Sequence, residues 1–200
     1  FDDFLASLSS AKRKKLKRER RRVVEQGIAV EVLRGDQIRA AQWGIFHRFY
    51  RSTFDRLGGY ATLSEPFFHH LSRTLPEAVV LALARYQGRY VAGALSLRSG
   101  DTLYGRHWGS EAEFHSLHFE LCYYIGIEYC IAHDLQRFEP GAQGEHKVGR
   151  GFEPTPTWSA HWLAEAPFHA LIARYLENER AAVIGYMNEL RDHLPYKTAP

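Results

Sequence analysis

Long apolar stretches are missing from this sequence of 200 residues, and no run is long enough to span a bilayer. Cysteine is scarce, and the sequence has two, Cys122 and Cys130. They lie eight positions apart in a segment that we expect to be helical, which is too far for a disulfide. The first residues also lack the apolar core of a signal peptide. We therefore expect a soluble cytoplasmic protein, with Phe1 an internal position of a longer chain.

Acidic residues are rare between Lys12 and Arg22, where nine lysines and arginines accompany one glutamate. The rest of the chain holds 17 basic and 22 acidic residues, so the net charge of +3 hides a local basic block. Such a density of charge favours a polyanionic partner. Three interpretations stay open: a solvated linker helix, a contact with RNA or nucleotide phosphates, and a contact with an anionic membrane. The membrane contact would use an apolar helix face of Phe1, Phe4, Leu5 and Leu8.

Glycine and proline are absent from Asp3 to Glu25, which predicts one helix that ends at Gly27. Alternating apolar residues predict six strands, at 28–33, 79–86, 90–97, 102–108, 135–140 and 157–163. Further helices are expected at 36–56, from Ser64, and at 116–134 and 167–193. The helix at 116–134 can act as a crossover that sets the next strand parallel to the preceding meander. The order predicts an α/β fold with a mixed, mostly antiparallel sheet of about six strands flanked by helices.

Three stretches carry a resemblance to a known family. They are the opening FDDFLASLSSAKRKKLKRERRRV, then YGRHWGS at 104–110, and the block from LHFELCYY to TPTWSAHW at 117–162. They resemble the FemAB-like branch of the GNAT N-acyltransferases, described as peptidoglycan biosynthesis or recognition proteins. Members carry two GNAT-like halves. The resemblance implies that 27–200 form a C-terminal GNAT-like acyltransferase domain, and that 1–26 are a basic helix leading in from a missing N-terminal half.

The resemblance also implies a reaction, in which an acyl or aminoacyl group moves from acyl-CoA or aminoacyl-tRNA to the amine of a small molecule or peptide. The tRNA would contact Lys12 to Arg22. In GNAT enzymes a glycine-containing loop at a helix N-terminus binds the CoA pyrophosphate. Here the corresponding segment is GSEAEFHSLH, with acidic Glu111 and Glu113 and no glycine pair. Aminoacyl-tRNA therefore suits the basic helix better as a donor than acetyl-CoA does.

The loop at 138–154, FEPGAQGEHKVGRGFEP, gathers the polar groups that acyl transfer needs. Such a reaction uses a base for the amine and donors that polarise the carbonyl. We expect acid or base roles for Glu139, His146 and Glu120. Substrate contacts are expected from Arg106, His107, Trp108, His118, Gly141, Gln143, Gly144 and Glu145. Donor phosphates would meet Lys147 and Arg150. A solvated turn with caps and salt bridges is the other interpretation of this loop.

Glu120 lies inside an apolar helix, where an unpaired carboxylate is costly, so we expect a partner for it. The candidates are Arg106, His107 and Arg137. The pair could be structural, or Glu120 could be a general base with a shifted pKa. His115 and His118 precede it without an HExxH pattern, and we expect no metal site. Two other functions stay open: non-catalytic recognition of a peptide or cell-wall precursor, and a nucleic-acid-binding module centred on the basic block.

Overall fold

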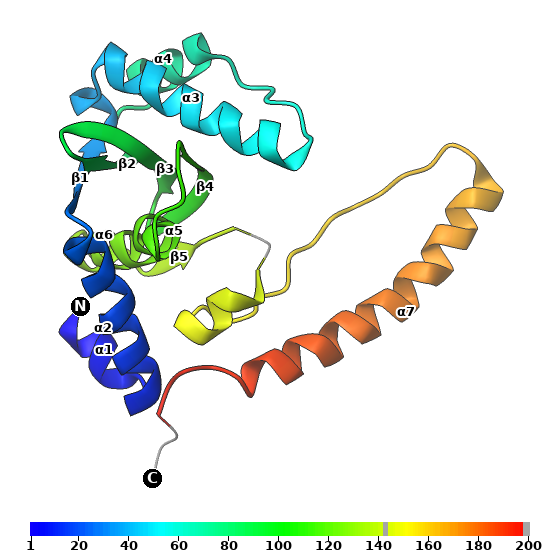
Figure 1. The fold of residues 1–200 in the computed structure, drawn as a ribbon. Coiled ribbons are helices and arrows are strands. Elements are labelled where there is room, and N and C mark those ends of the chain that lie inside the picture. Colours follow the sequence, from blue (N-terminus) through cyan, green and yellow to red (C-terminus); the bar gives the residue numbers. More distant parts are fainter. Residues whose placement is uncertain (142–143, 198–200) are drawn as a thin grey trace. The chain divides into compact units, whose positions relative to one another are not determined.

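The computed structural model describes residues 1–141 and 144–197 of the chain (Figure 1). Contacts divide the chain into two compact units. The first unit comprises Phe1–Asp3 and Lys14–Ala142, and the second comprises Phe4–Arg13 and Gln143–Pro200.

A five-stranded sheet organises the first unit, with its strands in the order β1-β2-β3-β4-β5. Neighbouring strands are antiparallel from β1 to β4, whereas β5 runs parallel to β4. The mixed, mostly antiparallel sheet and the parallel last strand confirm the predicted fold class. The strands are β1 (Ile28–Arg34), β2 (Val79–Tyr86), β3 (Arg89–Ser99), β4 (Thr102–Ser110) and β5 (Arg137–Glu139).

The strand expected at 157–163 does not form, so that prediction is wrong. Its apolar side chains alternate as the pattern required, but no described strand lies beside it to accept the backbone hydrogen bonds. Trp158 and Trp162 are 82% and 81% exposed. Alternation describes the two faces of a strand, and it carries no information about whether a neighbouring strand is present.

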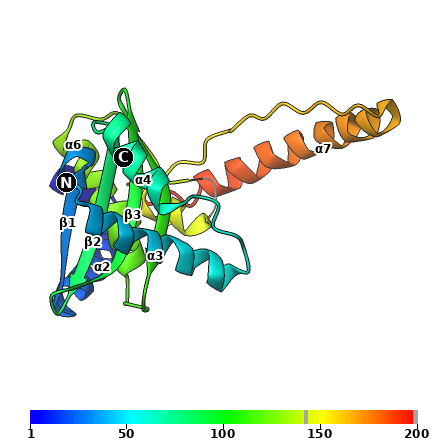
Figure 2. The ribbon, with the colours of Figure 1, turned by 90° about the horizontal axis from the view of Figure 1, so that it is seen from above.

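Helices cover both faces of the sheet (Figures 1 and 2). On one face lie α3 (Ala40–Leu57) and α4 (Glu65–Thr74). Their aromatic side chains meet large aliphatic residues of β2 and β3, and the buried members are Trp43, Phe46, Phe49, Tyr50, Phe68, Val79, Leu81, Leu83 and Leu95. On the other face, alanines of β2 and β3 meet Val23 of α2, Leu117 and Leu121. Small residues on this face let the helical segment at 117–124 approach β2 and β3 closely.

The helix expected from Asp3 to Glu25 is divided in two, as α1 (Asp2–Ser7) and α2 (Ser10–Glu25). The helix is interrupted where residues from the C-terminal end of the chain, which belong to the same second unit, contact it. Leu8 forms an isolated bridge with Tyr196, and the amide of Ser9 donates to the carbonyl of Pro195 at 2.8 Å. These contacts satisfy the backbone where the helix is interrupted.

The helix expected at 36–56 begins later than predicted, because Asp36 lies in a 3₁₀ turn, η1 (Gly35–Gln37). The helix α3 begins at Ala40, where the Gln42 side chain accepts a hydrogen bond from the amide of Arg39 at 2.9 Å. The helix expected at 116–134 is helical from 117 to 132, but in three parts. A single π turn, η2 (Glu120–Tyr124), separates α5 (Leu117–Phe119) from α6 (Ile125–Ala132). Such turns insert one residue and change the direction of the side chains.

The second unit contains a 3₁₀ helix, η3 (Glu145–Arg150), and the long helix α7 (Ala166–Arg191). The latter confirms the helix expected at 167–193. Within the described part of the chain, no helix combines the length and the apolar character needed to cross a membrane.

Candidate functional site

The pairing between β4 and β5 is short and leaves part of β4 open. It covers Thr102 to Tyr104 of β4 and ends at Glu139, whereas β4 continues to Ser110. Beyond the paired residues, side chains of α3 form hydrogen bonds with backbone carbonyls of β4. Thr53 donates to the carbonyl of Trp108 at 2.8 Å, and Ser52 donates to the carbonyl of Ser110 at 3.2 Å. Between the residues paired with β5 and those bonded to α3, the segment Gly105–His107 has no strand partner on the β5 side among the described residues.

A β-bulge lies within this open segment. On β3, Leu95 faces His107 and Ser96 faces Gly105, so Arg106 is the extra residue. A bulge of this kind interrupts pairing and re-aims side chains, and it is frequent beside active sites. Gly105 suits the position, because a Cβ there would lie 3.3 Å from the Cα of Pro140, where the chain leaves β5. The chain that leaves β5 thus packs closely against Gly105, and pairing between β4 and β5 has already ended there.

The bulge also changes which side chains share a face. Trp108 pairs with Ala94 and lies on the α2 and α6 side, whereas Tyr104 pairs with Leu97 on the α3 side. The guanidinium of Arg106 lies over the Tyr104 ring at 5.6 Å. Strict alternation along the strand would place Arg106 and Trp108 on one face, and the extra residue shifts that alternation.

His107 is a half-buried ring beside the gap. It packs edge-on against Tyr50 of α3, with ring centroids 4.9 Å apart. Burial lowers the pKa of His107, and the nearby charge of Arg106 lowers it further. The imidazole is therefore neutral at pH 7 and has a nitrogen able to accept a proton.

Trp108 and His118 meet on the opposite face of the sheet. Their rings lie edge-on at 5.2 Å, and His118 also contacts Tyr123 at 5.5 Å. The structure thus brings His118 beside β4, as expected, but across the strand from His107.

Glu139 ends β5 at the point where pairing with β4 stops, as the sequence predicts for this carboxylate. Its side chain is exposed, and within the described residues it forms no hydrogen bond or ion pair. Gly141 follows with a positive φ of 95°. Gln143 lies outside the described residues.

The remaining expected site residues belong to the second unit, in and before η3. The hydroxyl of Tyr186 donates to Glu145. Arg150 is 4% exposed and donates to the carbonyl of His146 at 2.8 Å. Burial lowers the pKa of His146, and the charges of Arg150 and Lys147 add to the effect. Gly144 precedes the turn with a positive φ of 106°. The loop at 138–154 is thus shared between the two units.

Glu120 has a partner that differs from all three candidates. Arg20 of α2 donates to both of its carboxylate oxygens, at 3.1 and 3.2 Å through Nε and at 2.9 Å through Nη2. The same guanidinium reaches Glu128 at 2.7 Å. Expecting Arg106, His107 or Arg137 was wrong, because the cation comes from the basic block 100 positions earlier. Burial raises the pKa of Glu120, and the hydrogen bonds from Arg20 oppose that shift.

The loop before α5 is occupied by the end of α2. Gln26 donates to the carbonyl of His115 at 3.0 Å and accepts from its amide at 3.2 Å. Arg22 lies 3.0 Å from the ring nitrogen Nε2 of His115. The exposed carboxylates of Glu111 and Glu113 stand in the same loop. An anion at this helix N-terminus would meet two like charges and an amide that is already bonded.

Sequence reasoning missed the residues of α2 and α3 that build these contacts. Arg20, Gln26 and Thr53 have no motif, and their partners are far away in the chain. One signal was available for Arg20, since a buried glutamate requires a cation and the basic block is the densest source of cations.

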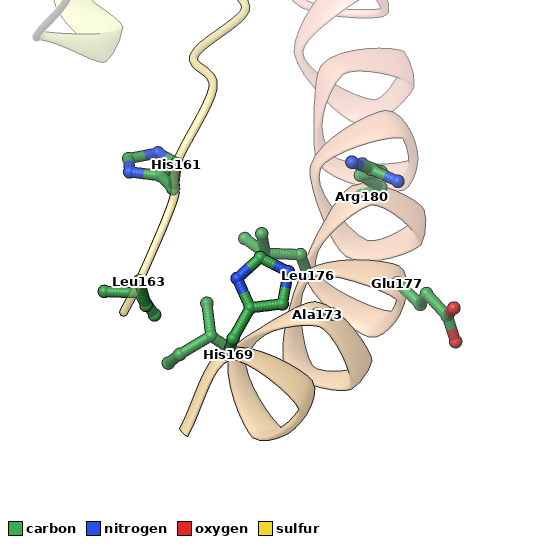
Figure 3. A pocket seen from close by; sticks show the side chains of 8 residues that line it. His161, Leu163, His169, Ala173, Leu176, Glu177 and Arg180 are labelled. Atoms are coloured by element: carbon green, nitrogen blue, oxygen red, sulfur yellow. The ribbon is translucent and has the colours of Figure 1, made fainter. Parts of the chain in front are cut away.

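A hollow of the surface lies at other residues than these. One of about 210 Å³ belongs to the second unit, between the segment at 161–163 and α7 (Figure 3). Leu163, Ile172 and Leu176 form its apolar part, and its polar lining is His161, His169, Glu177 and Arg180. In the described residues, no group of three or more His, Cys, Asp or Glu side chains is arranged to hold a metal ion.

The mainly antiparallel sheet with a parallel last pair of strands is similar to the fold of solved acetyltransferases. The aminoglycoside acetyltransferase meta-AAC0020 from an uncultured soil metagenomic sample, in complex with trehalose, matches with a TM-score of 0.52 at 10% identity. The match covers 72% of this chain and 99% of that enzyme. The sisomicin complex gives a TM-score of 0.50 at 11% identity, over 72% of this chain and 98% of that one. The fold is therefore an acyltransferase fold.

The chain belongs to the FemAB-like family, described as peptidoglycan biosynthesis/recognition, whose model matches residues 1–198. The structure of FemX is similar, with a TM-score of 0.51 at 16% identity over 66% of this chain. The match spans 48% of FemX, about half its length. No curated protein matches the sequence.

Proposed function

We propose that this chain is an N-acyltransferase domain that moves an acyl or aminoacyl group from an activated donor to an amine, in the gap between β4 and β5. The open, bulged segment Gly105–His107 is the observation that carries the proposal. The family and the acyltransferase fold support it.

The backbone of the open segment supplies the electrophilic part of the reaction. Attack of the amine on a thioester or ester carbonyl places negative charge on the carbonyl oxygen. Backbone N–H groups directed at that oxygen stabilise it, and losing one such donor typically slows a reaction by about 100- to 1,000-fold. The backbone N–H groups of this segment that point away from β3 are our candidates for this role.

Protons move through the side chains beside the gap. A new C–N bond forms, the C–S or C–O bond of the donor breaks, the amine gives up a proton, and the leaving group takes one. The neutral imidazole of His107 and the exposed carboxylate of Glu139 are our candidates for the group that accepts the proton of the amine. Glu120 is held by Arg20, which favours a structural role for it over proton transfer. The predicted roles of His146, Lys147 and Arg150 stay predictions.

The donor stays open between acyl-CoA and aminoacyl-tRNA, but its phosphates should not be held at the start of α5. Gln26 and the carboxylates of Glu111 and Glu113 oppose an anion there. Acetyl-pantetheine lacks the phosphates of acetyl-CoA, so a preference for acetyl-CoA would measure phosphate binding elsewhere, for which Lys147 and Arg150 are the predicted residues. If Lys147→Gln/Arg150→Gln kept the whole of that preference, the predicted phosphate contacts would be wrong.

Mass spectrometry of amine acylation tests the function with a panel of acyl-CoA and aminoacyl-tRNA donors. We expect Glu139→Gln and His107→Gln each to lower turnover at least tenfold, while Glu113→Gln, an exposed carboxylate away from the gap, serves as the matched control. A chain that binds donor or peptide but transfers nothing would instead be a recognition domain. Equal turnover by all variants would show that the site is misplaced.

A further inference from the structure

The basic helix α2 has two faces with different environments. The inward face packs through Leu16 and Val23, which are 1% and 2% exposed, and through Arg20 bonded to Glu120. The helix is therefore fixed to the first unit, and it is not a free linker.

The outward face of α2 carries unpaired cations. Lys14, Lys17, Arg18 and Arg21 are exposed and recur at the spacing that places side chains in one stripe, and Lys15 flanks them. Within the described residues, none of the five forms an ion pair or hydrogen bond. Glu25 ends the stripe. We call these five side chains the basic face.

We propose that the basic face docks on an anionic lipid surface. Each lysine or arginine held next to such a surface strengthens binding by about fivefold, so the basic face can provide reversible attachment without any insertion. The exposed Val24, 71% accessible at the end of α2, would meet the same surface.

The composition of the face favours lipid over nucleic acid. It covers about 12 Å of one helix and presents lysine and arginine alone, without aromatic rings to stack on bases or amides to read them. Anionic lipids diffuse laterally and gather under any spacing of cations, whereas the phosphates of a nucleic acid have fixed positions. A contact made of charge alone therefore fits the fluid surface better.

Insertion of an amphipathic helix is a different mechanism, and the structure argues against it here. Two of the four apolar residues that such a helix would need are buried, since Leu5 and Leu8 are 6% and 0% exposed, and Phe1 and Phe4 are partly buried. The contact is therefore electrostatic, and salt should weaken it.

Vesicle co-sedimentation of the 200-residue chain tests the proposal, with phosphatidylglycerol mixed into phosphatidylcholine, pure phosphatidylcholine, and a short RNA duplex as probes. We expect binding to the mixed vesicles alone. The variant Lys14→Gln/Lys17→Gln/Arg21→Gln should bind about a hundredfold more weakly. The control Arg48→Gln/Arg51→Gln/Arg89→Gln removes the same charge from exposed positions elsewhere and should bind as the wild type does.

Equal loss in both triple variants would overturn the proposal, because net charge rather than the basic face would then explain binding. Binding to the RNA duplex in place of the vesicles would overturn it too, and so would failure of the unmodified chain to bind mixed vesicles. Circular dichroism of both triple variants should match the wild type, since all six side chains are exposed.

Discussion

Replacing Arg20 by alanine removes the cation between two carboxylates of the first unit. Arg20 makes three hydrogen bonds to Glu120 and two to Glu128, and the Glu120 side chain is only 7% exposed. Breaking a buried pair typically costs about 3–5 kcal/mol, because the remaining charge is left without compensation. The partial exposure of Arg20, 26%, and of Glu128, 38%, reduces that figure. We expect a loss of about 2–4 kcal/mol in the free energy of unfolding.

The loss should depend on pH in a defined direction. Without Arg20, burial and the charge of Glu128 remain and both raise the pKa of Glu120, so this pKa in the folded variant lies above its unfolded value of about 4.3. A raised folded pKa contributes stability below the unfolded value, and this contribution disappears as the pH rises through the folded pKa. The variant should therefore be closest to the wild type in acid and furthest from it near pH 7.

Urea unfolding, followed by circular dichroism at several pH values, measures the difference in the free energy of unfolding between Arg20→Ala and the wild type. Arg21→Ala removes the neighbouring exposed arginine and should cost less than about 0.5 kcal/mol. Arg20→Met combined with Glu120→Gln removes the unpaired charge and should recover part of the loss. If Arg20→Ala were no more damaging than Arg21→Ala, the assignment of Glu120 to a structural ion pair would be refuted.

Three further predictions concern single residues. Gly109→Ala places a Cβ 1.9 Å from the carbonyl oxygen of Phe49, so we expect a loss of at least about 3 kcal/mol or failure to fold, measured by thermal unfolding. Gly185→Ala meets nothing within 4 Å inside α7 and should gain up to about 1 kcal/mol in the same assay; a loss would contradict the packing described. In the transfer assay, the rate should fall in acid with an apparent pKa below about 6.5. This limb should vanish in His107→Gln, and an unchanged profile would exclude His107 as the base.

The strands and helices of the first unit could largely be predicted from the sequence. Their apolar residues recur at the spacing of a strand or a helix, because one side of each element faces the core. The predicted bounds of β2, β3 and β4 agree with the observed ones within a few residues. The parallel direction of β5 follows from the length of the helix that precedes it. The π turn at Glu120–Tyr124 could not be predicted in this way, since its five residues are as apolar and helix-compatible as their neighbours.

The candidate site was predictable only in part. Glu139 at the end of a strand and the polar segment around His107 could be found, because strand ends and interrupted alternation are visible in the sequence. The bulge at Arg106 was not visible, since it depends on the register between β3 and β4. The partners of Glu120 and of the loop before α5 come from α2, and no local pattern encodes a contact made across about 90 to 100 positions.

Hydrogen–deuterium exchange in the presence of a transferable acyl donor tests the central claim most directly. Donor bound in the gap between β4 and β5 should slow exchange at Tyr104–Trp108 and leave the amides of the segment at 161–163 and α7 unchanged. Protection confined to the hollow at 161–180, with β4 unaffected, would contradict the account.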